Sequence, residues 1–120
     1  MKTLIVGASE HSFRYSNMAA HLLEDHNQEF EMLGKRGGKL LDREILMIND
    51  RPSLKEVHTI TLYINPTNQV DIYDYLLSLK PSRMIFNPGT ENYELASLAT
   101  SQQIEVVEAC TLVMLRTGQY

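Results

Sequence analysis

Short apolar runs recur along the chain and are separated by longer, mainly polar segments. The runs occupy residues 4–6, 30–33, 60–64, 84–86 and 104–107. Runs of this length that do not strictly alternate apolar with polar positions are typical of parallel strands buried on both faces. The pattern therefore predicts five parallel strands.

Three of the intervening segments have the apolar spacing of helices. Their apolar faces are formed by Met18, Leu22 and Leu23, by Val70, Tyr73, Leu76 and Leu77, and by Leu95, Leu98 and Ala99. Asn65 followed by Pro66 predicts the start of the second helix, because asparagine is a good N-cap and proline suits the first helical position. The expected caps of the first and third helices are Ser16 or Asn17 and Thr90 or Asn92.

The segment 34–53 has little helical spacing and is too long for a simple turn. We interpret it as a Gly-rich loop, a short extended piece around residues 45–48 and one turn near residues 52–55. Strands that alternate with helices through right-handed crossovers predict an α/β fold, a three-layer Rossmann-like domain with a five-stranded parallel sheet. Residues 1–120 are expected to form this single domain, since the chain has the length of one typical domain.

Composition narrows the class of partner. The net charge of −4 argues against nucleic acid, whose binding needs an excess of Lys and Arg. No apolar run approaches the ~20 residues of a membrane span, and the first apolar triplet is too short for a signal peptide. We therefore expect a cytoplasmic protein with no membrane partner. A small α/β domain can form a homodimer, although no residue pattern demonstrates one.

Small polar residues and an arginine gather directly after the first predicted strand, where open parallel sheets bind their ligands. The residues at this position are Gly7, Ala8, Ser9, Arg14 and Ser16. Gly7 permits a tight turn, the next helix offers unpaired N–H groups, and Arg14 can hold a phosphate with two hydrogen bonds. We expect anion binding here. The alternative is a tight turn with serine caps and a solvated arginine.

The second predicted strand ends in Gly34, Lys35 and Arg36. An NAD site would have an acidic residue here, about 20 residues after the glycine loop, to bind the ribose hydroxyls. Two cations instead suit a ligand with an additional phosphate on its ribose, such as NADP or coenzyme A (CoA). The alternative is a basic hairpin exposed to water.

The third and fourth predicted strands are followed by Asn65 and Pro66 and by Asn87 and Gly89. These residues can be simple caps and turns. They can also form the walls beside the middle of an elongated ligand. The residues alone leave both interpretations open.

Taken in order, these clusters resemble those of the small stand-alone CoA-binding proteins, relatives of the CoA-binding Rossmann domain of the succinyl-CoA synthetase alpha subunit. The resemblance covers nearly the whole chain. It is carried by Val-Gly-Ala-Ser at 6–9, Arg14, Ser16, Gly-Lys-Arg-Gly-Gly at 34–38, Pro-Ser-Leu at 52–54, Ile-Asn-Pro at 64–66, residues 89–94 and Cys110. It implies a binding site for a nucleotide cofactor, CoA or an acyl-CoA.

The resemblance also implies how the cofactor would lie. The diphosphate would rest on residues 7–9 and on the amides leading into the helix near Ser16. Lys35 and Arg36 would face the adenosine end and its 3′-phosphate. The walls along the adenine or the pantetheine would be Asn65, Pro66 and residues 87–89.

No residue is nominated for catalysis. The four histidines lack metal-ligand spacing and Cys110 is the single cysteine, so no metal site is expected. Cys110 is either an ordinary core residue or a thiol near the end of the pantetheine arm. The alternatives to a binding module are an NADP-binding, reductase-like module and a subunit of an acyl-CoA-using enzyme whose reactive residues come from another chain.

Overall fold

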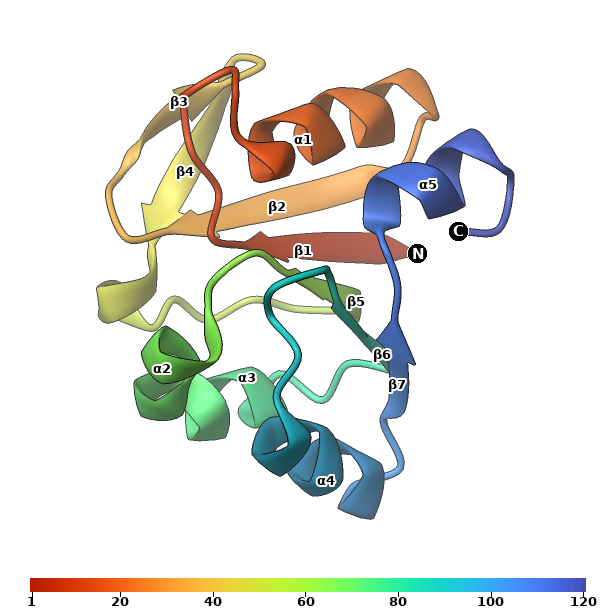
Figure 1. The fold of residues 1–120 in the computed structure, drawn as a ribbon. Helices are drawn as coiled ribbons and strands as arrows, with labels where there is room; N and C mark the ends of the chain where they lie inside the picture. The colour runs from red at the N-terminus through yellow and green to blue at the C-terminus, as the bar shows by residue number, and fades with distance from the viewer.

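The sheet contains seven strands rather than five. The computed structural model describes all 120 residues (Figure 1). Its strands are β1 (Lys2–Val6), β2 (Glu29–Gly34), β3 (Gly38–Leu40), β4 (Arg43–Met47), β5 (Val57–Leu62), β6 (Arg83–Phe86) and β7 (Glu105–Glu108). They lie in the order β3-β4-β2-β1-β5-β6-β7, and every neighbouring pair is parallel except β3 and β4. The predicted α/β class and parallel core are confirmed, and the predicted strand number is wrong.

The two additional strands form a hairpin within the segment 34–53, which we had expected to be mostly loop. A turn at Leu41 and Asp42 joins β3 to β4, and both residues have positive φ (55° and 59°). That conformation belongs to the tight turns that match the twist of hairpins. Within β3 and β4 only Ile45 is buried. Neither strand therefore has the apolar run that marks a buried strand.

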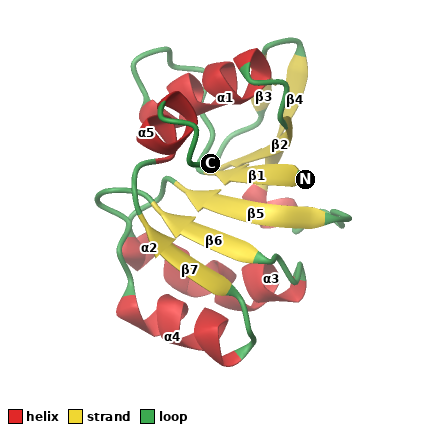
Figure 2. Ribbon diagram, turned by 90° about the vertical axis from the view of Figure 1, so that its right-hand side faces the viewer, coloured by secondary structure: helices red, strands yellow, loops and turns green.

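Five helices cover the two faces of the sheet. They are α1 (Tyr15–Asp25), α2 (Pro66–Gln69), α3 (Tyr73–Ser78), α4 (Tyr93–Ser101) and α5 (Thr111–Arg116), with 3₁₀ turns η1 (Ile48–Asp50) and η2 (Val70–Ile72). α1 and α5 lie on one face and α2, α3 and α4 on the other, which gives the predicted three layers (Figure 2). None of these helices is long and apolar enough to cross a membrane. The apolar spacing had not predicted α5.

Two of the predicted helix caps are confirmed. The Asn65 side chain accepts a hydrogen bond from the amide of Asn68 (3.0 Å) at the start of α2. The Asn92 side chain accepts one from the amide of Leu95 (3.3 Å) at the start of α4. The helices that follow β5 and β6 therefore begin where local side-chain chemistry indicates.

The start of α1 differs from the prediction. The helix begins at Tyr15 with Arg14 at the N-cap position, and no side chain caps it. Ser16 and Asn17, the predicted caps, lie inside the first turn and are buried. The turn expected near residues 52–55 is also wrong, because the turn in this segment is η1.

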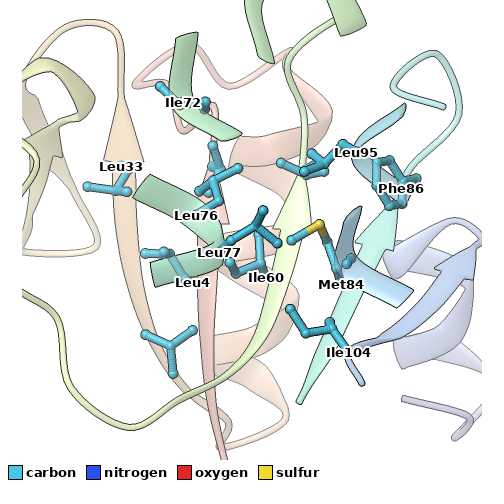
Figure 3. Close-up of a cluster of buried hydrophobic side chains, with 14 of the residues drawn as sticks. Leu4, Leu33, Ile60, Ile72, Leu76, Leu77, Met84, Phe86, Leu95 and Ile104 are labelled. Atoms are coloured by element: carbon cyan, nitrogen blue, oxygen red, sulfur yellow. The ribbon is translucent and has the colours of Figure 1, made fainter. Parts of the chain in front are cut away.

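The larger of two apolar clusters lies between the sheet and helices α3 and α4 (Figure 3). Leu76, Leu77 and Leu95 come from these helices. The strand residues of the cluster include Leu4, Leu33, Ile60, Met84 and Phe86. Each fully buried leucine contributes about 1.5–3 kcal/mol to stability. Val70 and Leu98, expected on the apolar helix faces, are instead 53% and 39% exposed.

β4 pairs with β2 only at the carboxyl end, through Leu33 and Gly34. Residues 29–32 of β2 have no strand beside them on that edge. The Arg43 guanidinium covers the edge: it lies 4.1 Å from the ring centroid of Phe30 and donates to the Phe30 carbonyl oxygen (3.1 Å). An arginine side chain thus occupies the place of a neighbouring strand.

The strand order places a topological switch between β1 and β5. From β1 the chain adds β2 and the hairpin on one side, and from β5 onward it adds strands on the other side. Open α/β sheets bind ligands beyond the carboxyl ends of the strands at such a point. The loops after β1, β2, β5 and β6 therefore lie where a ligand is expected to bind.

Candidate functional site

A cleft of about 920 Å³ opens beside these loops. Its lining includes most residues of the segment 7–16, here called the serine loop. It also includes residues 35–37, called the cationic loop, and the β5–α2 loop at 63–65 with Pro88 and Thr90. Its volume is near the upper end of the range for ligand pockets, about 300–1,000 Å³. The predicted site residues that line it are Gly7, Ala8, Ser9, Arg14, Ser16, Lys35, Arg36 and Asn65.

Gly7 makes the sharp turn at the end of β1. Its φ of +103° is rarely adopted by residues with a side chain. A Cβ atom here would also lie 2.8 Å from Cγ2 of Ile64 and 3.1 Å from the carbonyl carbon of Tyr63. Glycine is therefore required both by the turn and by the close approach of the β5–α2 loop.

The amides of Gly7 and Ala8 are not free to bind a ligand. Both donate to the carbonyl oxygen of Leu33 at the end of β2 (2.9 Å each). This contact corrects the expectation that the whole Gly-Ala-Ser turn presents bare main-chain donors to an anion. The free donors begin one residue later, because the amides of Ser9 and Glu10 have no protein acceptor.

The start of α1 supplies further free donors. Tyr15 and Ser16 are the first two residues of the helix, so their N–H groups have no intrahelical acceptor. These amides also carry the positive end of the helix dipole. With the two amides of the loop, they form a set of unpaired donors beside the cleft.

A buried asparagine supports the serine loop. Asn17, only 3% exposed, donates from Nδ2 to the carbonyl oxygen of Ser9 (3.0 Å). The Ser9 hydroxyl in turn accepts a hydrogen bond from the amide of His11 (3.1 Å). Sequence reasoning had interpreted Asn17 only as a candidate cap and missed this role, because nothing local indicates a contact eight residues back.

Three cationic side chains at the cleft, those of Arg14, Lys35 and Arg36, are exposed and make no hydrogen bond or ion pair with the protein. Elsewhere Arg43 and Arg51 donate to main-chain carbonyl oxygens at 3.0–3.1 Å. The cleft cations therefore keep their hydrogen-bonding capacity for a bound anion.

The opposite wall of the cleft is fixed by a buried glutamine. Gln69 is fully buried and donates from Nε2 to the carbonyl oxygens of Ile64 and Thr90 (2.9 Å each). Its Oε1 accepts a hydrogen bond from Asn92 (2.8 Å). One side chain thus ties together the loops that follow β5 and β6, and its role could not be inferred from the sequence.

Asn87, predicted to line the ligand, has a different position. Its Nδ2 donates to the Thr61 hydroxyl (2.7 Å) and the Leu62 carbonyl oxygen (2.8 Å), and its Oδ1 accepts from the Thr111 amide (2.8 Å). The side chain is 3% exposed and does not line the cleft. It joins β5 to the start of α5.

Three other predicted residues also lie outside the cleft lining. Gly34 packs against the serine loop, since a Cβ atom would lie 2.7 Å from the Ala8 carbonyl oxygen. Pro66 occupies the first turn of α2, and Gly89 is exposed and donates to the Glu91 carboxylate (2.9 Å). Pro88 and Thr90 line the cleft in place of their neighbour Gly89.

Tyr63 lines the cleft while its hydroxyl is buried without a hydrogen-bond partner. Burial raises the pKa of Tyr63 to about 12, and the nearby hydroxyls of Thr111 and Thr61 only partly oppose that rise. Cys110, at the N-cap of α5, is partly buried and does not line the cleft. The cleft therefore contains no thiol.

Exposed aromatic side chains stand at the rim of the serine loop. Phe13 and Tyr15 are 70% and 68% exposed. His11 stacks on Phe13 with ring centroids 5.4 Å apart, and the Arg14 guanidinium lies 5.5 Å from the same ring. Such surfaces can cover a planar base, since aromatic rings and bases stack.

Residues 1–116 match the family described as CoA binding domain. The chain belongs to this family. No curated protein matches it.

Solved structures share the fold over nearly the whole chain. The crystal structure of an uncharacterised protein is 50% identical in sequence and has a TM-score of 0.95. The match covers 99% of this chain and 97% of that chain. A hypothetical protein from Pyrococcus horikoshii OT3 is 18% identical with a TM-score of 0.83, over 96% of this chain and 81% of that one. A protein from Thermus thermophilus is 18% identical with a TM-score of 0.83, and the match covers 99% of this chain and 90% of that chain.

Proposed function

We propose that the protein binds CoA or an acyl-CoA in this cleft and catalyses no reaction on it. The family supports a CoA-related ligand. One observation carries the assignment to this cleft: unpaired amides and unpaired cations face the same space from two neighbouring loops. CoA carries anionic groups at two separate places, a diphosphate and a 3′-phosphate, and two such clusters suit it.

The diphosphate is assigned to the serine loop. The amides of Ser9 and Glu10 and those at the start of α1 are the donors without protein acceptors. A helix start favours negative charge through its free N–H groups and its dipole. Arg14 adds an exposed guanidinium that can bind two phosphate oxygens at once.

The 3′-phosphate is assigned to Lys35 and Arg36 of the cationic loop. Both side chains line the cleft and neither is engaged by a carboxylate. The apolar parts of the ligand are assigned to Ile45, Ile64 and Pro88, which lie among the same lining residues. No nucleophile is hydrogen-bonded to a base in this lining, which supports binding without chemistry.

Calorimetric titration with CoA, acetyl-CoA and dephospho-CoA tests the proposal. We expect dephospho-CoA to bind more weakly by about 1.5–3 kcal/mol, the value of a hydrogen bond to a charged group. Lys35→Ala with Arg36→Ala should remove that difference. Lys55→Ala, a change to an exposed lysine just before the amino end of β5, is the matched control.

NADP and NAD complete the titration series, because NADP also carries an additional ribose phosphate. Tighter binding of NADP than of CoA would favour the reductase-like alternative. Equal affinity for CoA and dephospho-CoA would refute the role of the cationic loop. No binding of any CoA form would refute the proposed function.

A further inference from the structure

Glu10 of the serine loop reaches across to the β3–β4 hairpin. Its Oε2 accepts a hydrogen bond from the main-chain amide of Lys39 in β3 (2.9 Å), a residue 29 positions further along the chain. No other side chain of the serine loop bonds to the hairpin. The Glu10 carboxylate thus makes the one side-chain hydrogen bond between the serine loop and the β3–β4 hairpin, which follows the cationic loop.

The backbone of the hairpin is shaped around this carboxylate. Gly38 has φ of +150°, and a Cβ atom there would lie 2.5 Å from Cδ of Glu10 and 2.7–2.8 Å from its two oxygens. The preceding Gly37 is different, since the nearest atom to a Cβ built on it lies 3.6 Å away. Only Gly38 is therefore required for the carboxylate to reach its position.

This contact fixes the far end of the cationic loop. The near end of the cationic loop follows β2, which is held by the hydrogen bonds from the amides of Gly7 and Ala8 to the carbonyl oxygen of Leu33. At its far end, residues 35–37 lead into the backbone that Glu10 holds. Glu10 makes no ion pair with a lysine or arginine, although it lines the same cleft as three cationic residues.

We propose that Glu10 is a positioning residue for ligand selectivity: it holds the cationic loop at a set separation from the serine loop, so that the cleft prefers nucleotides with a ribose phosphate in addition to a diphosphate. This inference rests on the proposed function. A purely electrostatic role makes the opposite prediction, because removal of a negative charge from the cleft would by itself tighten the binding of any anion.

Two substitutions at position 10 separate these roles. Glu10→Gln removes the charge and keeps an oxygen that can accept the Lys39 amide hydrogen. Glu10→Ala removes both. Positioning predicts that Glu10→Ala loses the preference for CoA over dephospho-CoA and that Glu10→Gln retains it. An electrostatic role predicts that both variants bind both ligands more tightly.

The experiment combines calorimetry with amide hydrogen exchange. In Glu10→Ala we expect the ratio of CoA to dephospho-CoA affinity to fall by about fivefold or more, and exchange at the Lys39 amide to accelerate about tenfold or more. In Glu10→Gln, the affinity ratio and the exchange rate at Lys39 should both lie closer to their wild-type values. An unchanged affinity ratio in Glu10→Ala, or identical behaviour of the two variants, would overturn the inference.

Glycine substitutions test the contact from the hairpin side. Gly38→Ala displaces the carboxylate and should reproduce the effects of Glu10→Ala. Gly118→Ala should leave the affinity ratio unchanged, because Gly118 also has positive φ, has open space around an added Cβ, and lies outside the cleft lining. Equal effects of the two alanines would count against the inference. If the wild-type protein binds no CoA, the proposed function fails and the selectivity fails with it. The exchange rate at Lys39 then still reports whether Glu10 holds the hairpin.

Discussion

The two sides of the cleft are stabilised by different means. The side that follows β5 and β6 is held by buried amide side chains, chiefly Gln69 and Asn87, whose polar atoms are bonded within the protein. On the side that follows β1 and β2, the buried Asn17 supports the serine loop from within. The one side-chain hydrogen bond between the two loops of this side comes from an exposed carboxylate, that of Glu10, and the side carries unpaired cations. One side gives the cleft its shape, and the other gives it charge.

This difference indicates where stability and ligand binding can be changed separately. A buried donor or acceptor that loses its partner costs about 1–3 kcal/mol, whereas a change at an exposed position usually costs less than about 0.5 kcal/mol. Substitutions on the β5–β6 side should therefore change the free energy of unfolding. Those at the exposed positions of the β1–β2 side should change affinity with little effect on folding.

The largest effect on stability is expected at Gln69. Gln69→Leu leaves the carbonyl oxygens of Ile64 and Thr90 without this donor, and we expect the free energy of unfolding to fall by about 3 kcal/mol. Urea denaturation measures the change. Gln102→Leu, at an exposed position after α4, is the control and should stay near wild type. Equal stabilities of the two variants would mean that the wall does not depend on the glutamine.

A smaller effect, visible only at high pH, is expected at Tyr63. Its pKa is raised from 10.0 to about 12, so the protonated hydroxyl contributes stability that is complete below pH 10 and is lost as the pH rises towards 12. At pH 11 the loss amounts to about 1.4 kcal/mol. Tyr63→Phe should lack this part of the fall in the free energy of unfolding at alkaline pH.

Denaturation at pH 8 and pH 11 measures that share. Tyr93→Phe, which changes a tyrosine that is 88% exposed, serves as the control. The other tyrosines with raised pKa values contribute equally to both variants. If the free energy of unfolding falls as much between pH 8 and pH 11 in Tyr63→Phe as in the control, the prediction is contradicted.

The smallest effect on stability is expected in the cationic loop. Lys35→Ala combined with Arg36→Ala removes no protein hydrogen bond, so the free energy of unfolding should change by less than about 0.5 kcal/mol. CoA affinity should nevertheless fall, and the difference from wild type should shrink as salt screens the charges. A loss of stability above 1 kcal/mol would remove the contrast between the two sides.

The fold was most predictable where burial is most complete. The central strands around Leu4, Ile60 and Met84 are apolar because helices cover both faces, and their runs are visible in the sequence. Asn65 and Asn92 cap helices through contacts three residues away, so local chemistry suffices to predict them. The hairpin escaped prediction because its strands are short and mostly solvent-exposed.

For the candidate site, the sequence indicated which loops border the cleft better than it indicated how their residues are bonded. The cations at Lys35 and Arg36 were found because an exposed charge at a strand end is visible in the sequence. The sequence could not show that the amides of Gly7 and Ala8 are bonded to Leu33, or that Asn87 bonds to α5, because these contacts depend on strand register and on elements 24–26 residues apart.

Arg43 has a consequence beyond the fold of this chain. An unpaired strand edge offers main-chain groups with which a second polypeptide can pair, and such edges promote aggregation. The guanidinium over Phe30 occupies one of these groups and brings a charge to the edge. The β3–β4 hairpin diverges from β2 and borders the cleft, which leaves part of β2 without a neighbouring strand. The Arg43 side chain shields this part of the sheet against pairing with a strand of another molecule.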